Sequence, residues 1–277
     1  MSAPELALHG VEEGRGSPLL VLHGFTGSSE SMAGVAAGLS GRHRVLRLDL
    51  LGHGESAAPR EPAAYSMERC VAQISAALDA RAIERAHVIG YSMGGRAALA
   101  LAAWRPERVR SALLVGASAG LADPKAREAR VRDDEALAQR IESEGLERFV
   151  DAWMALPLFE SQRRLGAEAL AAARAQRLRN RPHGLANSLR GMGSGAQPPL
   201  HPLLAQLLTP VALVHGEQDT KFAEIAHGLA AALPRGRAVA VANAGHACHL
   251  EAPHAFLELA DAWLAECDAA VRVRASA

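Results

Sequence analysis

The sequence predicts an α/β protein with a mostly parallel sheet that helices cover on both faces. Short apolar runs, typical of strands buried on both sides, alternate with longer segments of helical periodicity. This order is that of consecutive β–α units, which build parallel sheets. The expected strands are 18–22, 44–48, 86–91, 109–115, 211–214 and 238–241, and the expected helices are 28–39, 66–80, 94–104, 222–233 and 255–266.

The segment 120–205 interrupts this alternation. It is charged and helical, shows no convincing strand, and contains a loop rich in glycine and proline at 191–202. We therefore expect a core made of residues 1–119 and 206–277, with 120–205 as a helical cap inserted over the carboxyl edge of the sheet. Ligands bind at that edge in open α/β sheets. Residues 268–277 are expected to form a polar tail without regular structure.

The composition limits the setting and the partners of the protein. The 277 residues carry a formal net charge of zero, which argues against nucleic acid or an anionic membrane as the main partner. Three widely spaced cysteines form no disulfide or metal pattern and no nucleotide-binding glycine motif occurs, so we expect no cofactor and no metal. There is neither a signal-peptide pattern nor an apolar run of about 18 residues. We expect a cytoplasmic monomer without membrane insertion.

Residues 90–96 read Gly-Tyr-Ser-Met-Gly-Gly-Arg and lie between a predicted strand and a predicted helix. Glycines two positions before and after Ser92 are required where a strand turns sharply into a helix, because Cβ atoms would collide at the crossing. A serine in such a turn is a nucleophile elbow, which lifts a hydroxyl group above a parallel sheet. The motif and its context predict the α/β-hydrolase fold, with an inserted helical cap.

A serine hydroxyl becomes reactive when a base takes its proton and an acid orients that base. In this fold the three residues follow the chain order serine, acid, histidine. Asp219 and His246 follow two late strands, and Gly245 allows the turn that points the imidazole back. We predict Ser92, Asp219 and His246 as the catalytic triad. The alternatives are Asp219 as a helix cap alone, Glu217 as the acid, and His249 or His254 as the base.

Two backbone N–H groups are needed to stabilise negative charge that develops on a substrate oxygen. One is expected from Met93, directly after the serine. The other is expected from Phe25, in the loop 23–27 that follows the first buried strand. We therefore predict an oxyanion hole formed by the N–H groups of Phe25 and Met93, and we expect structural roles for His23 and His53.

Several strings of the sequence, taken jointly rather than singly, are specific to one family. They are His23-Gly24-Phe25, residues 90–96, Asp219-Thr220-Lys221-Phe222, Ala244-Gly245-His246, the arginine-rich segment from Gly120 to Asp134, Asp151-Ala152-Trp153, Pro157-Leu158-Phe159 and Gln197-Pro198. With these strings the chain resembles the 2-succinyl-6-hydroxy-2,4-cyclohexadiene-1-carboxylate synthases of menaquinone biosynthesis, from about Leu19 to Leu264.

The resemblance implies an elimination on a cyclohexene that bears succinyl, carboxylate and enolpyruvyl groups. A proton is removed next to the succinyl ketone, electrons shift through the ring, and pyruvate leaves. Ser92, polarised by His246, would act as the base, and the oxyanion hole would stabilise an enolate. The alternatives are a serine carboxylesterase, thioesterase or carbon–carbon bond hydrolase on a small anionic substrate, and a non-catalytic receptor on the same fold.

Such a substrate is a small polycarboxylate, and its three carboxylates need fixed cations. Forked guanidinium groups bind carboxylates through two parallel hydrogen bonds. Arg96 lies four residues after Ser92, on the same helical face, and is expected to bind one carboxylate.

The resemblance supplies the remaining predicted binding residues. It implies Arg130 and Arg179 in the cap as the other carboxylate ligands, and it implies Tyr91, Trp153 and Phe159 as residues that line the pocket. Two alternatives stay open here. Arg127 and Arg181 are close enough in sequence to replace the two cap arginines, and Trp153 and Phe159 could instead pack the cap's own core.

Overall fold

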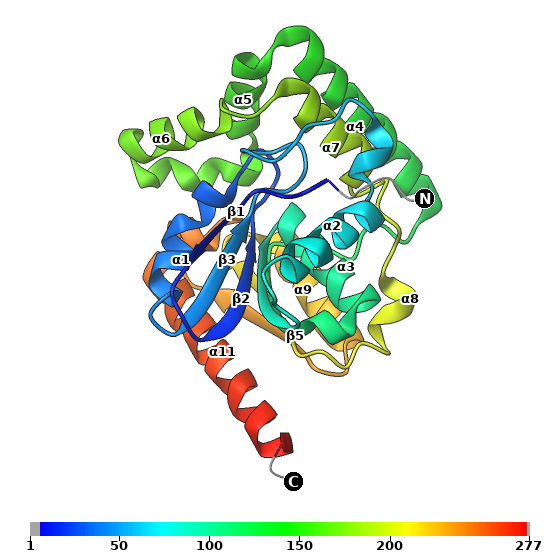
Figure 1. The fold of residues 1–277 in the computed structure, drawn as a ribbon. Helices are drawn as coiled ribbons and strands as arrows, with labels where there is room; N and C mark the ends of the chain where they lie inside the picture. The colour runs from blue at the N-terminus through cyan, green and yellow to red at the C-terminus, as the bar shows by residue number, and fades with distance from the viewer. Residues whose placement is uncertain (1–5, 276–277) are drawn as a thin grey trace.

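The computed structural model describes residues 6–275, and a seven-stranded sheet forms its centre (Figure 1). The strands are β1 (Gly10–Glu13), β2 (Ser17–Leu22), β3 (His43–Leu48), β4 (Ala86–Tyr91), β5 (Val109–Val115), β6 (Val211–Gly216) and β7 (Gly236–Val241). Their order is β1-β3-β2-β4-β5-β6-β7, and neighbouring strands are parallel apart from the antiparallel pair β1 and β3. The predicted parallel sheet is confirmed, and β1 is an edge strand that sequence analysis did not predict.

Helices cover both faces of the sheet, as predicted. They are α1 (Ala33–Leu39), α2 (Met67–Asp79), α3 (Met93–Trp104), α9 (Thr220–Ala232), α10 (Cys248–Glu251) and α11 (Pro253–Ala275), with short 3₁₀ turns η1 (Ser29–Met32), η2 (Pro62–Tyr65) and η3 (Pro106–Arg108). α2, α3 and α9 pack on one face, and α1 and α11 pack on the other (Figure 1). Within β2, Leu20 serves the first face whereas Leu19 and Val21 serve the second.

A layer of helices stands between β5 and β6 in the chain and lies over one end of the sheet (Figure 1). It consists of α4 (Pro124–Glu144), α5 (Leu146–Met154), the 3₁₀ segment η4 (Pro157–Leu165), α6 (Ala167–Arg177), α7 (Pro182–Met192) and α8 (His201–Leu204). This layer has its own apolar cluster, in which Ile141, Phe149 and Leu185 are buried. Its helical character agrees with the expected cap, while the domain boundaries at 120 and 205 stay a prediction.

The final helix is longer than predicted. Of the expected polar tail, residues 268–275 continue α11, and residues 276–277 lie outside the described residues. Asp268 explains the extension, because its carboxylate accepts a hydrogen bond at 3.0 Å from Nε2 of the buried His87 on β4. None of the helices in the described part of the chain has the length and apolar character of a membrane span.

The crossing of α3 over β2 leaves no room for a side chain at Gly94. A Cβ atom there would lie 2.5 Å from the carbonyl oxygens of both Leu22 and His23, which are backbone atoms that cannot move aside. Gly90 is constrained in the same way, since its Cβ would meet the backbone of Gly94. Gly90 and Gly94 are therefore required because backbone segments pass too close to them to leave room for a Cβ atom.

We expect Gly94→Ala to destabilise the protein by about 3 kcal/mol, because overpacking against backbone cannot be relieved by a rotamer change. Gly34→Ala in α1 is the matched control, since its Cβ would meet nothing within 4 Å. That control should be stabilised by about 0.5–1 kcal/mol. Urea unfolding measures both, and a Gly94→Ala variant as stable as the parent would contradict the interpretation.

Candidate active site

Ser92 stands alone between the end of β4 and the start of α3, with φ 51° and ψ −107°. A positive φ is rare for a residue with a side chain and costs about 1–3 kcal/mol, so the surroundings must hold it. Its N–H donates to the carbonyl of Val115 on β5 at 2.8 Å, and its own carbonyl accepts the N–H of Arg96 at 3.0 Å. The predicted turn is thus present, and hydrogen bonds to β5 and α3 hold the serine in it.

His246 joins Ser92 to Asp219. The imidazole Nδ1 lies 2.7 Å from Asp219 Oδ2, and Nε2 lies 3.3 Å from Ser92 Oγ. Because an ionised carboxylate can only accept, Nδ1 carries the proton and Nε2 is free to accept the serine proton. The structure brings the three predicted residues together from the ends of β4, β6 and β7.

Asp219 fills two roles at once. Its Oδ1 accepts the N–H of Phe222 and so caps α9, while its Oδ2 holds the imidazole of His246. Asp219 is therefore a helix cap, but the alternative that capping is its only role is wrong. The carboxylate is nearly buried, which strengthens both contacts.

The alternative acid and bases face elsewhere. Glu217 accepts the N–H of Asn243 at 3.0 Å. His249 is buried against Tyr91, with ring centroids 4.5 Å apart, and burial lowers the pKa of its imidazole to about 3. His254 is exposed in the first turn of α11. No hydrogen bond within residues 6–275 connects these three side chains to Ser92.

The two expected oxyanion donors both line the cavity above Ser92. Met93 opens α3, and Phe25 lies in a tight turn closed by the hydrogen bond from Gly27 N–H to Gly24 O at 3.0 Å. Within the described residues, neither N–H group donates a hydrogen bond to the protein. Both groups are therefore available to a ligand oxygen, although their role stays a prediction.

His23 ties the Phe25 loop to the chain that follows β3. Its Nδ1 donates to the carbonyl of Gly24 at 2.8 Å, and its Nε2 accepts the N–H of Leu50 at 3.0 Å. The second contact needs an unprotonated Nε2, and burial lowers the pKa of the imidazole accordingly. Both ring nitrogens of His23 are engaged with backbone, as expected for a structural histidine.

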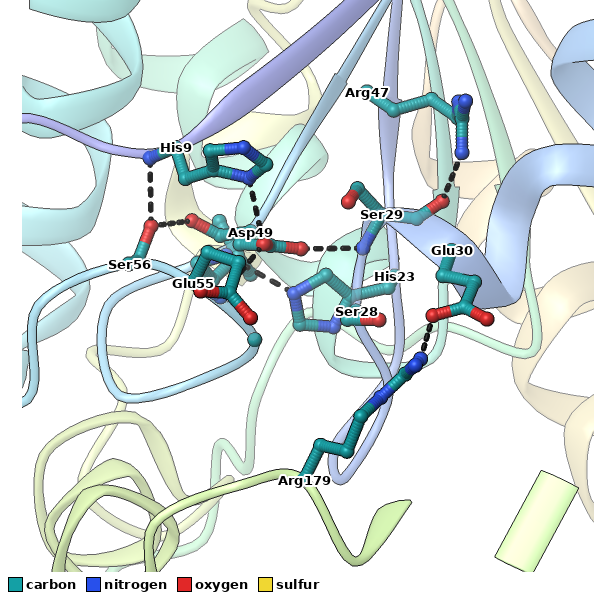
Figure 2. A network of polar contacts seen from close by, with 12 residues as sticks. His9, His23, Ser28, Ser29, Glu30, Arg47, Asp49, Glu55, Ser56 and Arg179 are labelled. Carbon is teal, nitrogen blue, oxygen red and sulfur yellow. Dashed lines mark hydrogen bonds and ion pairs between the residues drawn. The ribbon is translucent and has the colours of Figure 1, made fainter. Parts of the chain in front are cut away.

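Asp49 fixes the other side of this loop (Figure 2). Its carboxylate accepts the N–H groups of Ser29 and Glu55 and is paired with the imidazole of His9 at 2.9 Å. Burial alone would raise the pKa of Asp49, but these backbone donors hold it below its usual value. The carboxylate therefore stays ionised and connects η1, β1 and the loop after β3.

A cavity of about 900 Å³ opens above Ser92. Most of the predicted site residues line it: Phe25, Tyr91, Ser92, Met93, Arg96, Arg130, Trp153, Phe159 and His246. Trp153 also packs on Phe25, with ring centroids 5.1 Å apart, and on Phe149 in the cap cluster. Trp153 therefore both lines the cavity and packs against the apolar cluster of the cap.

Arg96 places a partly buried positive charge in the wall of this cavity. Its Nη1 donates to the carbonyl of Met192 at 2.6 Å and to Gln197 Oε1 at 2.7 Å, and both acceptors are neutral. Burial, followed by the charge of Arg130, lowers the pKa of Arg96 to about 10, so the group stays charged at neutral pH. Among the described residues Arg96 forms no ion pair, although a buried charge normally requires one. The cavity therefore favours an anionic ligand.

Comparison with known proteins agrees with this geometry. The family model of the alpha/beta hydrolase fold matches residues 17–253. The chain is 35% identical over 239 residues to 2-succinyl-6-hydroxy-2,4-cyclohexadiene-1-carboxylate synthase of Serratia proteamaculans, covering 86% of this chain and 89% of that protein. It is 40% identical over 246 residues to a Bacillus subtilis protein provisionally named as the same synthase, covering 89% of each. The chain belongs to this synthase family.

A solved structure supports the same assignment at the level of the fold. MenH from S. aureus superimposes with a TM-score of 0.89 at 30% identity, covering 95% of this chain and 99% of that one. MenH therefore shares the fold found here over nearly all of its chain.

The two cap arginines expected from the synthase family differ in position. Arg130 lines the cavity, and its Nε donates at 2.8 Å to Asp134, which is buried and partly neutralises it. Arg179 is a correction, because its guanidinium pairs with Glu30 (Figure 2). Both side chains are more than half exposed, and neither lines the cavity. The reason is that α6 ends at Arg177, so the backbone turns before Arg179 is reached.

The alternatives for these arginines are also occupied elsewhere. Arg127 Nε donates to the carbonyl of Gly195 at 3.4 Å, and Arg181 donates to the carbonyls of Gly54 and Ser56. Neither side chain lines the cavity above Ser92.

Sequence analysis missed two cations near the cavity. Arg177, the last residue of α6, is partly buried and does not itself line the cavity, and its Nε has no hydrogen-bond partner within the described residues. Burial raises the pKa of Tyr91, which does line the cavity, and the positive charge of Arg177 opposes that rise. Lys221 lines the cavity beside Phe222, whose ring lies 4.6 Å from the imidazole of His246. Lys221 could have been found from the sequence, because it belongs to the string Asp219-Thr220-Lys221-Phe222 that the chain shares with the synthase family. For Arg177 no sequence signal was available, because nothing in the spacing of the arginines favours it over Arg179.

Buried histidines should make the protein less stable in acid. Burial lowers the pKa of His53 and His249 to about 3, whereas the unfolded chain titrates near 6.5. Between these values only the unfolded state takes up the protons, so the free energy of unfolding is highest above pH 6.5 and falls as the pH drops toward 3. Urea unfolding at several pH values measures this dependence.

His249→Gln should reduce the slope of this acid destabilisation. His254→Gln is the matched control, because His254 is exposed five residues later and should leave the slope as in the parent. Equal slopes in the parent and in His249→Gln would show that His249 is not held neutral by burial.

Proposed function

We propose that this protein is a carbon–oxygen lyase of menaquinone (vitamin K2) biosynthesis. It eliminates pyruvate from 2-succinyl-5-enolpyruvyl-6-hydroxy-3-cyclohexene-1-carboxylate to give 2-succinyl-6-hydroxy-2,4-cyclohexadiene-1-carboxylate. The observation that carries the proposal is the partly buried guanidinium of Arg96, which forms no ion pair among the described residues and lies in the same cavity as the Ser92 hydroxyl. Membership of the synthase family supports the identity of the substrate.

The proposed base is Ser92 Oγ acting through His246. The imidazole accepts the serine proton at Nε2 as Oγ takes a proton from the carbon next to the succinyl ketone. The imidazolium that forms is stabilised by Asp219, whose Oδ2 lies 2.7 Å from Nδ1. The proton therefore leaves the carbon acid without a covalent acyl-enzyme.

The electrons of the broken C–H bond move onto the ketone oxygen and form an enolate. The N–H groups of Phe25 and Met93 are proposed to bind that oxygen, since both residues line the cavity and neither N–H group is used within the described residues. Collapse of the enolate shifts electrons through the ring and breaks the C–O bond to the enolpyruvyl group. The leaving group accepts a proton, for which the imidazolium of His246 is placed, and becomes pyruvate.

The proposed carboxylate ligands are Arg96, Arg130 and Arg177. Arg177 is proposed in place of Arg179, because its charge acts on Tyr91 in the cavity wall and its Nε has no hydrogen-bond partner within the described residues. Tyr91, Trp153 and Phe159 are proposed to pack against the ring and the succinyl chain, since they supply apolar surface in the same cavity.

The proposal extends to the setting of the enzyme. It is a cytoplasmic monomer with a core of residues 1–119 and 206–277, a cap of residues 120–205, and a small-molecule polycarboxylate as its substrate. The zero net charge and the three buried, unpaired cysteines support a reducing compartment without nucleic acid or membrane partners.

Removal of any triad member should abolish most of the activity. We expect Ser92→Ala, His246→Ala and Asp219→Asn each to lower kcat for pyruvate release by about 10³-fold, because each removes part of one proton relay. Ser143→Ala, an exposed serine of α4, is the control and should keep full activity. Pyruvate is followed by coupled reduction to lactate.

One experimental result would instead favour a serine hydrolase. If the parent releases no pyruvate from the cyclohexene substrate but is rapidly acylated at Ser92 by activated esters and turns over, the lyase proposal is wrong. Mass spectrometry of the intact protein detects that acyl-enzyme.

The arginines should affect the anionic substrate selectively. Arg96→Ala should lower kcat/KM for the tricarboxylate by about 10- to 100-fold, the value of a charge-assisted hydrogen bond pair. Arg177→Ala should lower it by about tenfold, and Arg179→Ala, which loses only a surface ion pair, should change it less than about threefold. Labelling of Ser92 by a neutral fluorophosphonate should be nearly unchanged in all three. Equal losses in both assays for Arg96→Ala would argue against a carboxylate role.

A further inference from the structure

A single buried carboxylate holds the loop that carries His246. Glu251, the last residue of α10, accepts the N–H of Gly245 at 2.8 Å through Oε2 and the N–H of Ala247 at 3.1 Å through Oε1. Its side chain is 0% exposed. The residues directly before and after His246 are therefore bound to the two oxygens of one group, and bonds from backbone N–H to a charged acceptor are stronger than neutral ones.

The cap reaches the same carboxylate. Arg164, in the 3₁₀ segment η4, donates from Nη2 to Glu251 Oε2 at 2.9 Å. Two further contacts of η4 fall on the same loop: the ring of Phe159 lies 6.1 Å from the imidazole of His246, and Gly245 lies so close to Ser161 that an added Cβ would overlap its hydroxyl. One short cap segment thus contacts the imidazole, its backbone and the carboxylate that supports both.

The position of His246 is critical on the Ser92 side. Nε2 lies 3.3 Å from Ser92 Oγ, longer than the 2.7 Å between Nδ1 and Asp219. Proton transfer depends steeply on this distance, so a small rotation of the loop would weaken the relay. Support on both flanks of His246 is therefore support for the reaction itself.

We propose that Glu251 and Arg164 form a clamp that positions His246 against Ser92 and couples this position to the cap. With η4 seated on the loop, Arg164 neutralises Glu251 and keeps the carboxylate under both N–H groups. When η4 moves away, Glu251 loses that partner and the imidazole is held less firmly. Both are positioning residues. The proposal rests on the proposed roles of Ser92 and His246 but not on the identity of the substrate.

Arg164→Ala tests the link to the cap. We expect kcat for pyruvate release to fall about three- to tenfold while KM changes less than twofold, since Arg164 is 39% exposed and its ion pair is partly screened. Arg163→Ala is the matched control, because the neighbouring arginine is 73% exposed and lies only near Glu160. Arg164→Lys should restore part of kcat by restoring the charge.

Glu251→Gln tests the link to the loop. The amide keeps one acceptor oxygen but places an NH₂ group against the other backbone N–H, so one buried donor loses its partner. We expect kcat to fall about 10- to 100-fold. Arg164→Ala should add little to this loss in the double variant, because both changes act through the same carboxylate. Additive losses would overturn the coupling.

The rate of Ser92 labelling by a neutral fluorophosphonate provides the second readout. It reports the Ser92–His246 pair without a polyanionic substrate, and it should fall in Arg164→Ala by the same factor as kcat. If the parent labels rapidly but releases no pyruvate, the lyase proposal fails and the clamp is still tested by labelling. A lower thermal midpoint for Arg164→Ala with unchanged kcat and labelling rate would reduce the clamp to a structural contact and overturn it. The measurements on Arg164→Ala test the clamp even if the Glu251→Gln variant fails to fold.

Discussion

The strained turn at Ser92 is the constraint on which the rest of the site depends. A positive φ at a serine is held because β5 binds its N–H, α3 begins at the next residue, and the chain passes too closely at Gly90 and Gly94 for any side chain. That single conformation directs Oγ into the cavity and leaves the N–H of Met93 free at the start of a helix. The nucleophile Ser92 and the proposed oxyanion donor Met93 are adjacent residues of the same turn, which fixes their relative position.

The parallel sheet then delivers every other reactive group to the same place. Parallel strands end at one edge, so the loops after β2, β4, β6 and β7 meet there although they are distant in sequence. Asp219 serves two purposes at this edge, because one carboxylate oxygen caps the N-terminus of α9 and the other orients His246. The layer of helices between β5 and β6 lies over this edge (Figure 1), and its segment η4 contacts the loop that carries His246.

The electrostatics of the cavity follow from burial. An aromatic and aliphatic lining lowers the local dielectric, which makes an unpaired guanidinium such as Arg96 costly in the free protein and strongly attractive to a carboxylate. The same surroundings would strengthen hydrogen bonds to an enolate oxygen. Binding of a polyanion and stabilisation of developing negative charge thus rely on one physical property of the site, its largely apolar lining.

Local rules and short spacings determined much of this protein from sequence alone. Strand and helix alternation, the glycines around Ser92, the chain order of Ser92, Asp219 and His246, and the placement of Arg96 one turn after the serine all depend on neighbours within a few residues or on a fixed fold order. Tertiary structure decided what depends on distant contacts. Pairing across the chain placed β1, extended α11 through His87 and Asp268, and joined Arg164 to Glu251. Beyond the end of α6, Arg179 pairs with Glu30 at the surface, since the direction of a side chain at a helix end is set by packing rather than by spacing.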